Sequence, residues 1–380
     1  MVFRFEVKLC RWLELHVYSR RLEVITVTKS YIPDRIKFQS YIDQIFESSW
    51  LTNRGPLVRL LEDRLRERLR VKHLILVANG SIALQIAYKA LELNGDVITT
   101  PFSFAATTST IAWENLNPVF ADIDPLSLNI DPQNIERLVT NRTSAILPVH
   151  VFGNPCNVDE IDRIAKNYGL RVIYDGAHAF DVKLRNESIF RHGDISTLSF
   201  HATKIFHTCE GGALVTNDDD LANRIRLLIN FGFSGIDKID CLGTNAKMNE
   251  LEAAMGLCVL DDIDQILTYR KQVFQWYSQL LSNHFLAQVP HPDARQNYSY
   301  IPILLDKEST LLRVADSLAK NEIFPRRYFY PSLDTLPYLA GRSCCPISRD
   351  VASRILCLPT YFGLSQQEVE RISAIVSKAL

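Results

Sequence analysis

The sequence of 380 residues lacks several features that would place it in other protein classes. No apolar run reaches the roughly 18 residues of a membrane-spanning helix, so we expect no membrane span. The net charge of -1 gives no electrostatic reason to expect binding to nucleic acid or to an anionic membrane surface. The eight cysteines form no C-x-x-C pair and no metal-ligand spacing with histidine, which favours reduced thiols in a cytoplasmic protein without a metal site. The G-x-G-x-x-G, Walker and H-E-x-x-H motifs and internal repeats are also absent.

What is present is an ordinary globular composition, with 47% hydrophobic and 22% charged residues. This length suffices for a large domain and a smaller one. Residues 1–24 mix basic, acidic and apolar residues without the apolar core and cleavage site of a signal peptide, so we expect a poorly ordered N-terminal extension there. The sequence alone does not decide whether this extension belongs to the native protein. We place the large domain at residues 25–263 and a small C-terminal domain at 264–380.

Short apolar runs alternate with helical patterns through the large domain. Alternation of this kind predicts a mainly parallel sheet covered by helices. The strands are expected at 73–78, 97–100, 117–121, 144–149, 171–174, 197–200 and 213–216.

Two polar residues follow strands of this predicted sheet, where α/β proteins place their chemistry. Asp175 comes directly after the strand at 171–174, and Lys204 follows the strand at 197–200. Pyridoxal phosphate requires an amine, with which it forms a Schiff base, and an acid beside its pyridine nitrogen. Either residue alone is equally typical of a surface lysine or a helix cap, whereas the pair indicates a pyridoxal phosphate site.

A candidate anion site follows the strand at 73–78. Asn79-Gly80-Ser81 lead into a predicted helix, whose first N–H groups and dipole favour a negative charge. Gly80 permits close approach, and the Ser81 hydroxyl can add a hydrogen bond. The residues alone fit a plain helix cap by Asn79 or Ser81 as well.

Two stretches carry a resemblance to a known family. SFHATKIFHTCEGGALVTND at 199–218 and YDGAHAF at 174–180 resemble the DegT/DnrJ/EryC1/StrS family of nucleotide-sugar aminotransferases, and the resemblance extends from about Ile25 to the C-terminus. It implies an α/β fold, the aspartate aminotransferase-like type I fold of transferases that depend on pyridoxal phosphate. That fold has a large, mainly parallel sheet of seven strands and a small C-terminal α+β domain, and it forms a homodimer that shares two active sites.

The resemblance also implies a set of cofactor contacts. Lys204 would be the catalytic lysine, and relatives with histidine at this position act as dehydratases, so the lysine favours transamination. The other matching positions would bind the phosphate, the ring face, the ring hydroxyl and the ring nitrogen, and they are Gly80, Ser81, Phe104, Asp175, His178 and Ser199. Asn245 would reach the cofactor phosphate of the neighbouring subunit.

Four further residues are substrate-binding candidates on the same resemblance: Thr52, Lys247, Arg327 and Tyr328. Lys247 stands where the family often has arginine, and lysine cannot offer the planar bidentate fork. An ordinary loop accounts for the Arg326–Pro331 cluster nearly as well as a nucleotide site does.

The reaction that the resemblance implies moves an amino group from L-glutamate to a nucleotide-linked 4-keto-6-deoxysugar, with deoxythymidine diphosphate (dTDP) as the nucleotide. The product would be an amino sugar for a surface polysaccharide such as the lipopolysaccharide O-antigen. The alternatives are a 3-keto-sugar, a UDP- or GDP-sugar, sugar dehydration with the same cofactor, or a non-catalytic regulatory protein. The sequence leaves the sugar, the nucleotide and the carbon that is aminated open.

Overall fold

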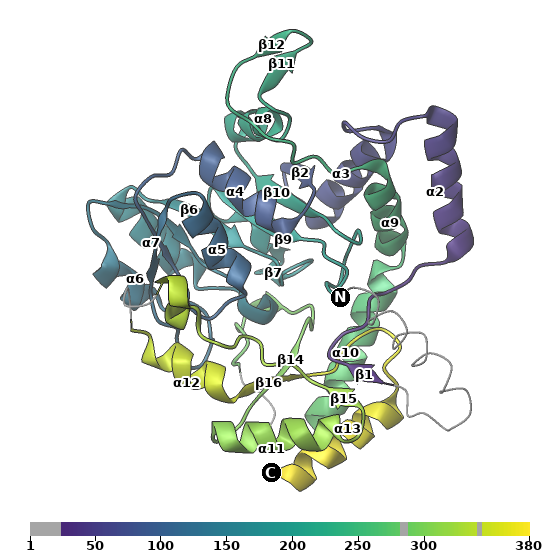
Figure 1. Ribbon diagram of the computed structural model, residues 1–380, viewed down its shortest axis with the longest axis vertical. Helices are drawn as coiled ribbons and strands as arrows, with labels where there is room; N and C mark the ends of the chain where they lie inside the picture. The colour runs from purple at the N-terminus through teal and green to yellow at the C-terminus, as the bar shows by residue number, and fades with distance from the viewer. Residues whose placement is uncertain (1–23, 282–287, 340–343) are drawn as a thin grey trace, which may run out of the picture.

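The computed structural model describes residues 24–281, 288–339 and 344–380 (Figure 1). The N-terminal extension expected at residues 1–24 therefore lies outside the described residues, except for Val24. None of the described helices is long and apolar enough to cross a membrane.

A seven-stranded sheet forms the centre of the larger part of the molecule. In spatial order its strands are β2 (His73–Val77), β10 (Gly212–Thr216), β9 (Ile195–Ser199), β6 (Arg171–Asp175), β5 (Thr143–Leu147), β3 (Asp96–Thr99) and β4 (Asn117–Phe120). β10 runs antiparallel to both of its neighbours, and the other neighbouring strands pair in parallel. The predicted α/β fold with a large, mainly parallel sheet is thus confirmed.

Helices cover both faces of this sheet. The side chains of each strand point alternately to the two faces, so the helices on each face pack on a separate set of side chains. In β6, Val172 and Tyr174 belong to one buried hydrophobic cluster and Ile173 to another. The first cluster includes residues of α3 (Pro56–Leu69), α6 (Pro132–Leu138), α7 (Val158–Tyr168) and α9 (Glu250–Asp261). The second includes residues of α4 (Gly80–Ala90), α5 (Ala105–Trp113) and α8 (Asp219–Leu228).

A smaller α+β part lies below the sheet in Figure 1, and the long helix α10 (Ile263–Leu280) connects the two. Val273 and Tyr277 of α10 lie in its separate hydrophobic cluster. The other elements of this cluster are α11 (Glu308–Ala319), α13 (Gln366–Ala379), the strand pair β14 (Ile301–Leu304) and β16 (Ile355–Leu358), and the strand pair β1 (Ile25–Thr26) and β15 (Ile323–Phe324). The boundary expected at Asp264 falls in the first turn of α10, while β1 packs with the smaller part although it lies near the start of the chain.

Further elements lie outside the central seven-stranded sheet. They are α2 (Arg35–Ser48), α12 (Pro346–Arg354), the small sheet β13 (Ala294–Arg295), β7 (Lys183–Leu184) and β8 (Glu187–Ser188), and the 3-10 helices η1 (Val151–Gly153), η2 (Ile189–Arg191), η3 (Leu333–Thr335) and η4 (Pro337–Leu339).

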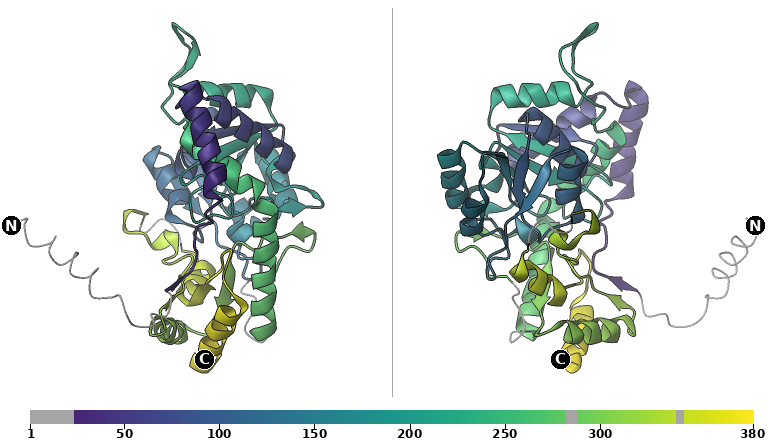
Figure 2. Two further views of the ribbon diagram at one scale, coloured as in Figure 1. Left: turned by 90° about the vertical axis from the view of Figure 1, so that its right-hand side faces the viewer. Right: turned by 60° about the vertical axis from the view of Figure 1, so that its left-hand side comes forward.

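A hairpin of β11 (Phe233–Gly235) and β12 (Lys238–Ile239) projects beyond α8 in every view (Figures 1 and 2). Its apolar side chains are exposed: Ile236 is 95% exposed, and Leu242, which follows β12, is 83% exposed. Exposed apolar side chains gathered on one projection are typical of a protein–protein interaction site.

Candidate active site

Loops at the carboxyl ends of four strands surround a cavity of about 600 Å³, a size typical of small-molecule sites. Parallel strands end at the same edge of a sheet, so residues from distant parts of the chain meet there. The structure brings eight of the predicted site residues to this cavity: Gly80, Ser81, Phe104, Asp175, His178, Ser199, Lys204 and Tyr328.

Asp175, the last residue of β6, is the buried acid of the cavity, with 6% of its surface exposed. Its Oδ2 accepts a hydrogen bond from the Thr107 hydroxyl at 2.9 Å, and its Oδ1 accepts one from the Ala177 N–H at 3.1 Å. Burial raises the pKa of the Asp175 carboxyl, although both hydrogen bonds and the nearby Lys204 oppose this shift. A buried carboxylate that is held in this way favours a cationic partner in the cavity.

Lys204 lies on the loop that follows β9, where its backbone N–H donates to the His201 carbonyl at 2.8 Å. Burial lowers the pKa of its amine to about 8, and the charge of Asp175 partly opposes this shift. A lowered pKa leaves a larger share of the amine neutral near neutral pH, which is the form that attacks a carbonyl.

The N-terminus of α4 lines the cavity and is its candidate anion-binding end. The Asn79 side chain caps the helix by accepting the Ile82 N–H at 2.8 Å, and Gly80 and Ser81 follow in the first turn. This cap is compatible with anion binding at the same turn, since it uses only one of the first-turn N–H groups. A Cβ at Gly80 would lie 2.9 Å from the Cβ of Ser199, so glycine allows the Ser199 hydroxyl to approach this turn.

His178 lies between the acid and an aromatic wall. Its ring stacks on Phe329 at 5.5 Å and meets Tyr300 edge-on at 4.9 Å. Burial, together with the charge of Lys204, holds the pKa of His178 well below its usual value, so its ring is neutral. The buried Nδ1 of His178 has no hydrogen-bond partner among the described residues, which leaves it available to a bound molecule.

Phe104 and Tyr328 line the cavity from opposite parts of the fold. Phe104 directly precedes α5 and is 56% exposed, which is compatible with a ring that packs on a ligand. Tyr328 comes from the smaller part of the molecule, and its ring meets Tyr300 edge-on at 5.5 Å.

Three predicted residues lie outside the lining of this cavity. Thr52 is exposed on the turn between α2 and α3. Asn245 and Lys247 flank Ala246, whose carbonyl accepts a hydrogen bond from the Ala78 N–H at 2.8 Å. This segment therefore runs beside the anion-binding end, but Asn245 is exposed and the Lys247 amine lies 5.0 Å from the ring of Phe231.

Arg327 also lies away from the cavity, which its neighbour Arg326 lines instead. The Arg327 guanidinium donates to Glu308 at 2.6 Å and to the Ser353 carbonyl at 2.8 Å. The segment is locally extended, because Arg326 exchanges backbone hydrogen bonds with Cys357. Residues two apart in extended chain share a side, so Arg326 and not Arg327 accompanies Tyr328.

Other residues that matter here were not predicted from the sequence. Thr107 and Tyr300 are the clearest, since the first binds Asp175 and the second packs against His178. Arg326 could have been predicted as a cavity residue, because in an extended segment it lies on the same side as Tyr328, two residues further on. Neither Thr107 nor Tyr300 carries a comparable local signal, because each is placed by a contact with a distant segment.

The described part of the chain contains no group of three or more His, Cys, Asp or Glu residues placed to hold a metal ion. An amine, a buried acid and an anion-binding helix end instead share one cavity, and this donor set fits pyridoxal phosphate. Lys204 would hold it covalently, Asp175 would face its ring nitrogen, and Gly80, Ser81 and Ser199 would hold its phosphate.

Comparison with known proteins points in the same direction. Residues 34–377 match the DegT/DnrJ/EryC1/StrS aminotransferase family. The dTDP-4-amino-4,6-dideoxy-D-glucose transaminase of Shigella dysenteriae is 42% identical over 359 residues, which cover 93% of this chain and 98% of that protein. The protein of the same name from Escherichia coli is 39% identical over 367 residues, with the same two coverages. The crystal structure of DesI in the presence of its TDP-sugar product aligns with a TM-score of 0.87 at 34% identity, covering 94% of this chain and 93% of that one.

Proposed function

The chain belongs to the DegT/DnrJ/EryC1/StrS aminotransferase family, and we propose that it transfers an amino group from L-glutamate to a dTDP-linked 4-keto-6-deoxysugar with pyridoxal phosphate as cofactor. The observation that carries this proposal is the meeting of Lys204, Asp175 and the α4 N-terminus in one cavity. Each group is of the kind that this cofactor needs, and the three come from separate strand ends.

The cofactor, when bound, supplies an electron sink that stabilises negative charge on the carbon next to the amine. Asp175 keeps the pyridine nitrogen protonated through a charge-assisted hydrogen bond. Its own orientation is fixed by Thr107 and Ala177. The neutral His178 offers its free Nδ1 to the ring hydroxyl, and Phe104 packs on the ring face.

Lys204 has two tasks in this proposal. It would hold the cofactor, and its amine, when free, would take the proton from the Cα of the donor amino acid as general base. The pKa of about 8 suits this task, because an amine that is partly neutral near pH 7 can both take up and return a proton.

The choice of acceptor follows from the relatives. The two relatives of 42% and 39% identity are named for dTDP-4-amino-4,6-dideoxy-D-glucose, and DesI was crystallised with a TDP-sugar product. The ketone that corresponds to this amino sugar is a dTDP-4-keto-6-deoxysugar. Arg326 and Tyr328, which line the cavity, are suited to a phosphate and a ring respectively.

We further propose that the active form is a homodimer. The β11–β12 hairpin carries exposed apolar residues, and Asn245 is exposed beside the anion-binding end without lining the cavity of its own protomer. Asn245 would instead complete the phosphate site of a second copy.

The absorption spectrum of the purified protein tests the cofactor and the donor together. A visible band that bleaches when L-glutamate is added supports the proposal. A band that L-glutamate leaves unchanged favours another donor or dehydration, and no band even after addition of pyridoxal phosphate favours a non-catalytic protein.

A further inference from the structure

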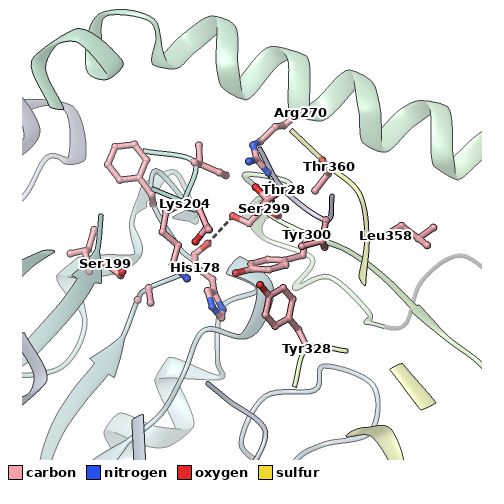
Figure 3. Close-up of a pocket in the computed structure, with 17 residues that line it drawn as sticks. Thr28, His178, Ser199, Lys204, Arg270, Ser299, Tyr300, Tyr328, Leu358 and Thr360 are labelled. Atoms are coloured by element: carbon pink, nitrogen blue, oxygen red, sulfur yellow. Dashed lines mark hydrogen bonds between the residues drawn. The ribbon is translucent and has the colours of Figure 1, made fainter. Parts of the chain in front are cut away.

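A second, smaller chamber adjoins the main cavity, and we call it the inner chamber (Figure 3). Its volume is about 30 Å³, and it shares Lys204, His178, Tyr300 and Tyr328 with the main cavity. The inner chamber is also lined by three residues that take no part in the proposed cofactor contacts: Thr28, Arg270 and Thr360. In Figure 3, Arg270 extends from α10 toward Thr28 and Ser299.

Arg270 is buried, and none of the described carboxylates forms an ion pair with it. Only 4% of its surface is exposed, and its Nη1 donates to the Ser299 carbonyl at 3.1 Å. Burial lowers the pKa of its guanidinium to about 10, and the Tyr300 phenol partly opposes this shift. Asp175 lines the main cavity but not the inner chamber. A buried charge that lacks a partner is costly, so this arrangement calls for an anion.

Three hydrogen-bonding atoms of the inner chamber are buried without a partner among the described residues. They are Nε of Arg270, Oγ1 of Thr28 and Oγ1 of Thr360. Buried donors are normally paired, and three unpaired ones around one chamber indicate a bound group that accepts hydrogen bonds. Guanidinium and hydroxyl groups together are the donors that typically bind an oxyanion.

The size of the chamber selects the kind of oxyanion. A cavity needs about 10–15 Å³ of this volume for each water molecule, so 30 Å³ holds about two oxygen atoms. A carboxylate has two oxygens, whereas a phosphate has four. The planar fork of arginine also matches a carboxylate.

We propose that the inner chamber binds a carboxylate of the amino-acid donor, with Arg270 as the residue that selects this substrate. The inference rests on the proposed function, because it assigns a subsite to the donor of that reaction. The Lys204 amine forms part of the chamber wall, so an amino acid that reacts there can place a carboxylate against Arg270. The sugar substrate has no carboxylate. One active site can therefore accept two unlike substrates by using different groups for each.

The test compares two half-reactions of the holoenzyme, each followed through the cofactor absorption band. L-Glutamate drives one, and dTDP-4-amino-4,6-dideoxyglucose drives the other in reverse. We expect Arg270→Gln to raise the L-glutamate concentration for half-maximal rate by about 30-fold or more, since it removes one partner of a buried charged pair. The reaction with the amino sugar should stay within about twofold of the wild-type rate, because that substrate leaves the chamber empty of carboxylate.

Lys271→Gln is the matched control, since it removes a positive charge from the next, exposed position of α10 and should change neither half-reaction. Equal loss of both half-reactions in Arg270→Gln would mean a purely structural role and would overturn the proposal, as would no loss in either. If Arg270→Gln does not fold, Thr28→Val and Thr360→Val decide the matter. They keep side-chain shape and remove the unpaired hydroxyls, and a loss confined to L-glutamate supports the proposal, while an unchanged L-glutamate reaction contradicts it.

L-Glutamine separates the two carboxylates of the donor, because it keeps the carboxylate on Cα and lacks the one on the side chain. If Arg270→Gln affects the reactions of both amino acids equally, the chamber binds the carboxylate on Cα. If it affects L-glutamate alone, the chamber binds the side-chain carboxylate.

Failure of the proposed function gives a different result, namely a wild-type protein that reacts with neither substrate. Calorimetry with glutarate then tests carboxylate binding in the inner chamber without any reaction. If glutarate binds to the wild-type protein and not to Arg270→Gln, the inner chamber is a carboxylate site. If glutarate does not bind to the wild-type protein, the proposed carboxylate site is overturned.

Discussion

Thr107 donates its hydroxyl hydrogen to Oδ2 of Asp175 over 2.9 Å, and the Ser103 hydroxyl lies 2.8 Å from that of Thr107. Ser103 and Thr107 flank the start of α5, whereas Asp175 ends β6. Two segments that lie far apart in the sequence thus hold one carboxylate in a fixed orientation.

Asp175→Asn should retain the fold and lose most of its activity. An amide cannot keep the pyridine nitrogen protonated, so we expect turnover to fall by about 100-fold or more. Steady-state rates and thermal melting measure the two effects separately. Thr107→Val is the comparison, since it keeps the carboxylate and should cost less; wild-type turnover in Asp175→Asn would remove the assigned role.

The rate at which the protein without cofactor binds pyridoxal phosphate should depend on pH through Lys204. The neutral amine is the nucleophile, and the pKa of Lys204 is lowered from 10.5 to about 8, so the rate should rise with pH and level off above about 8. Because the charge of Asp175 raises the pKa of Lys204, Asp175→Asn should move this midpoint to lower pH. Rapid-mixing absorbance measures both curves, and a midpoint near that of an ordinary lysine would contradict the burial of this amine.

Gly80→Ala should weaken cofactor binding. The added Cβ would lie 2.9 Å from the Cβ of Ser199, so the α4 turn and the serine must move apart. Overpacking of this kind typically costs about 1–3 kcal/mol. The control is Gly235→Ala in β11, where the nearest atom lies 3.7 Å away. Fluorescence titration with pyridoxal phosphate should show a loss of affinity for Gly80→Ala alone, and equal affinities would argue against a phosphate site at this turn.

Mixed dimers test the role of Asn245 across the interface. Lys204→Ala and Asn245→Ala should each be nearly inactive alone. A mixed dimer has one site with both residues intact if Asn245 serves the other protomer, so random mixing should restore about a quarter of the wild-type sites. If Asn245 acted in its own protomer, the sites of the mixture would all remain defective and activity would not return.

How far the sequence predicts this fold and site depends on the range of the interactions involved. The positions of Asp175 and Lys204 were predictable because each comes after an apolar run that forms a strand, and parallel strands end at one edge, whereas Ser199 was expected only from the family resemblance. The N-terminus of α4 was predictable from a strand, a turn of small residues and a helix. These signals depend only on residues that are neighbours in the sequence, so tertiary contacts do not alter them.

Other features arise only from tertiary packing. Arg270 sits in the middle of an amphipathic helix, where an arginine is expected on the solvent side, yet its side chain is buried beside Ser299. Arg327 looked like an anion ligand, but Glu308 already binds it, while Arg326 lines the cavity. Alternation along the extended segment places Arg326 on the side of Tyr328, but the acid that binds Arg327 comes from another helix, which no local pattern indicates.

The transfer of labelled nitrogen from L-glutamate to a ketosugar tests the proposed aminotransferase activity. The purified protein, loaded with pyridoxal phosphate, is incubated with a dTDP-4-keto-6-deoxysugar and L-glutamate that carries heavy nitrogen, and the nucleotide sugars are analysed by mass spectrometry. The account predicts a dTDP-amino sugar that carries the heavy nitrogen, formed together with 2-oxoglutarate and absent with Lys204→Ala. A ketosugar that is recovered unchanged, or one that loses water without gaining nitrogen, would contradict it.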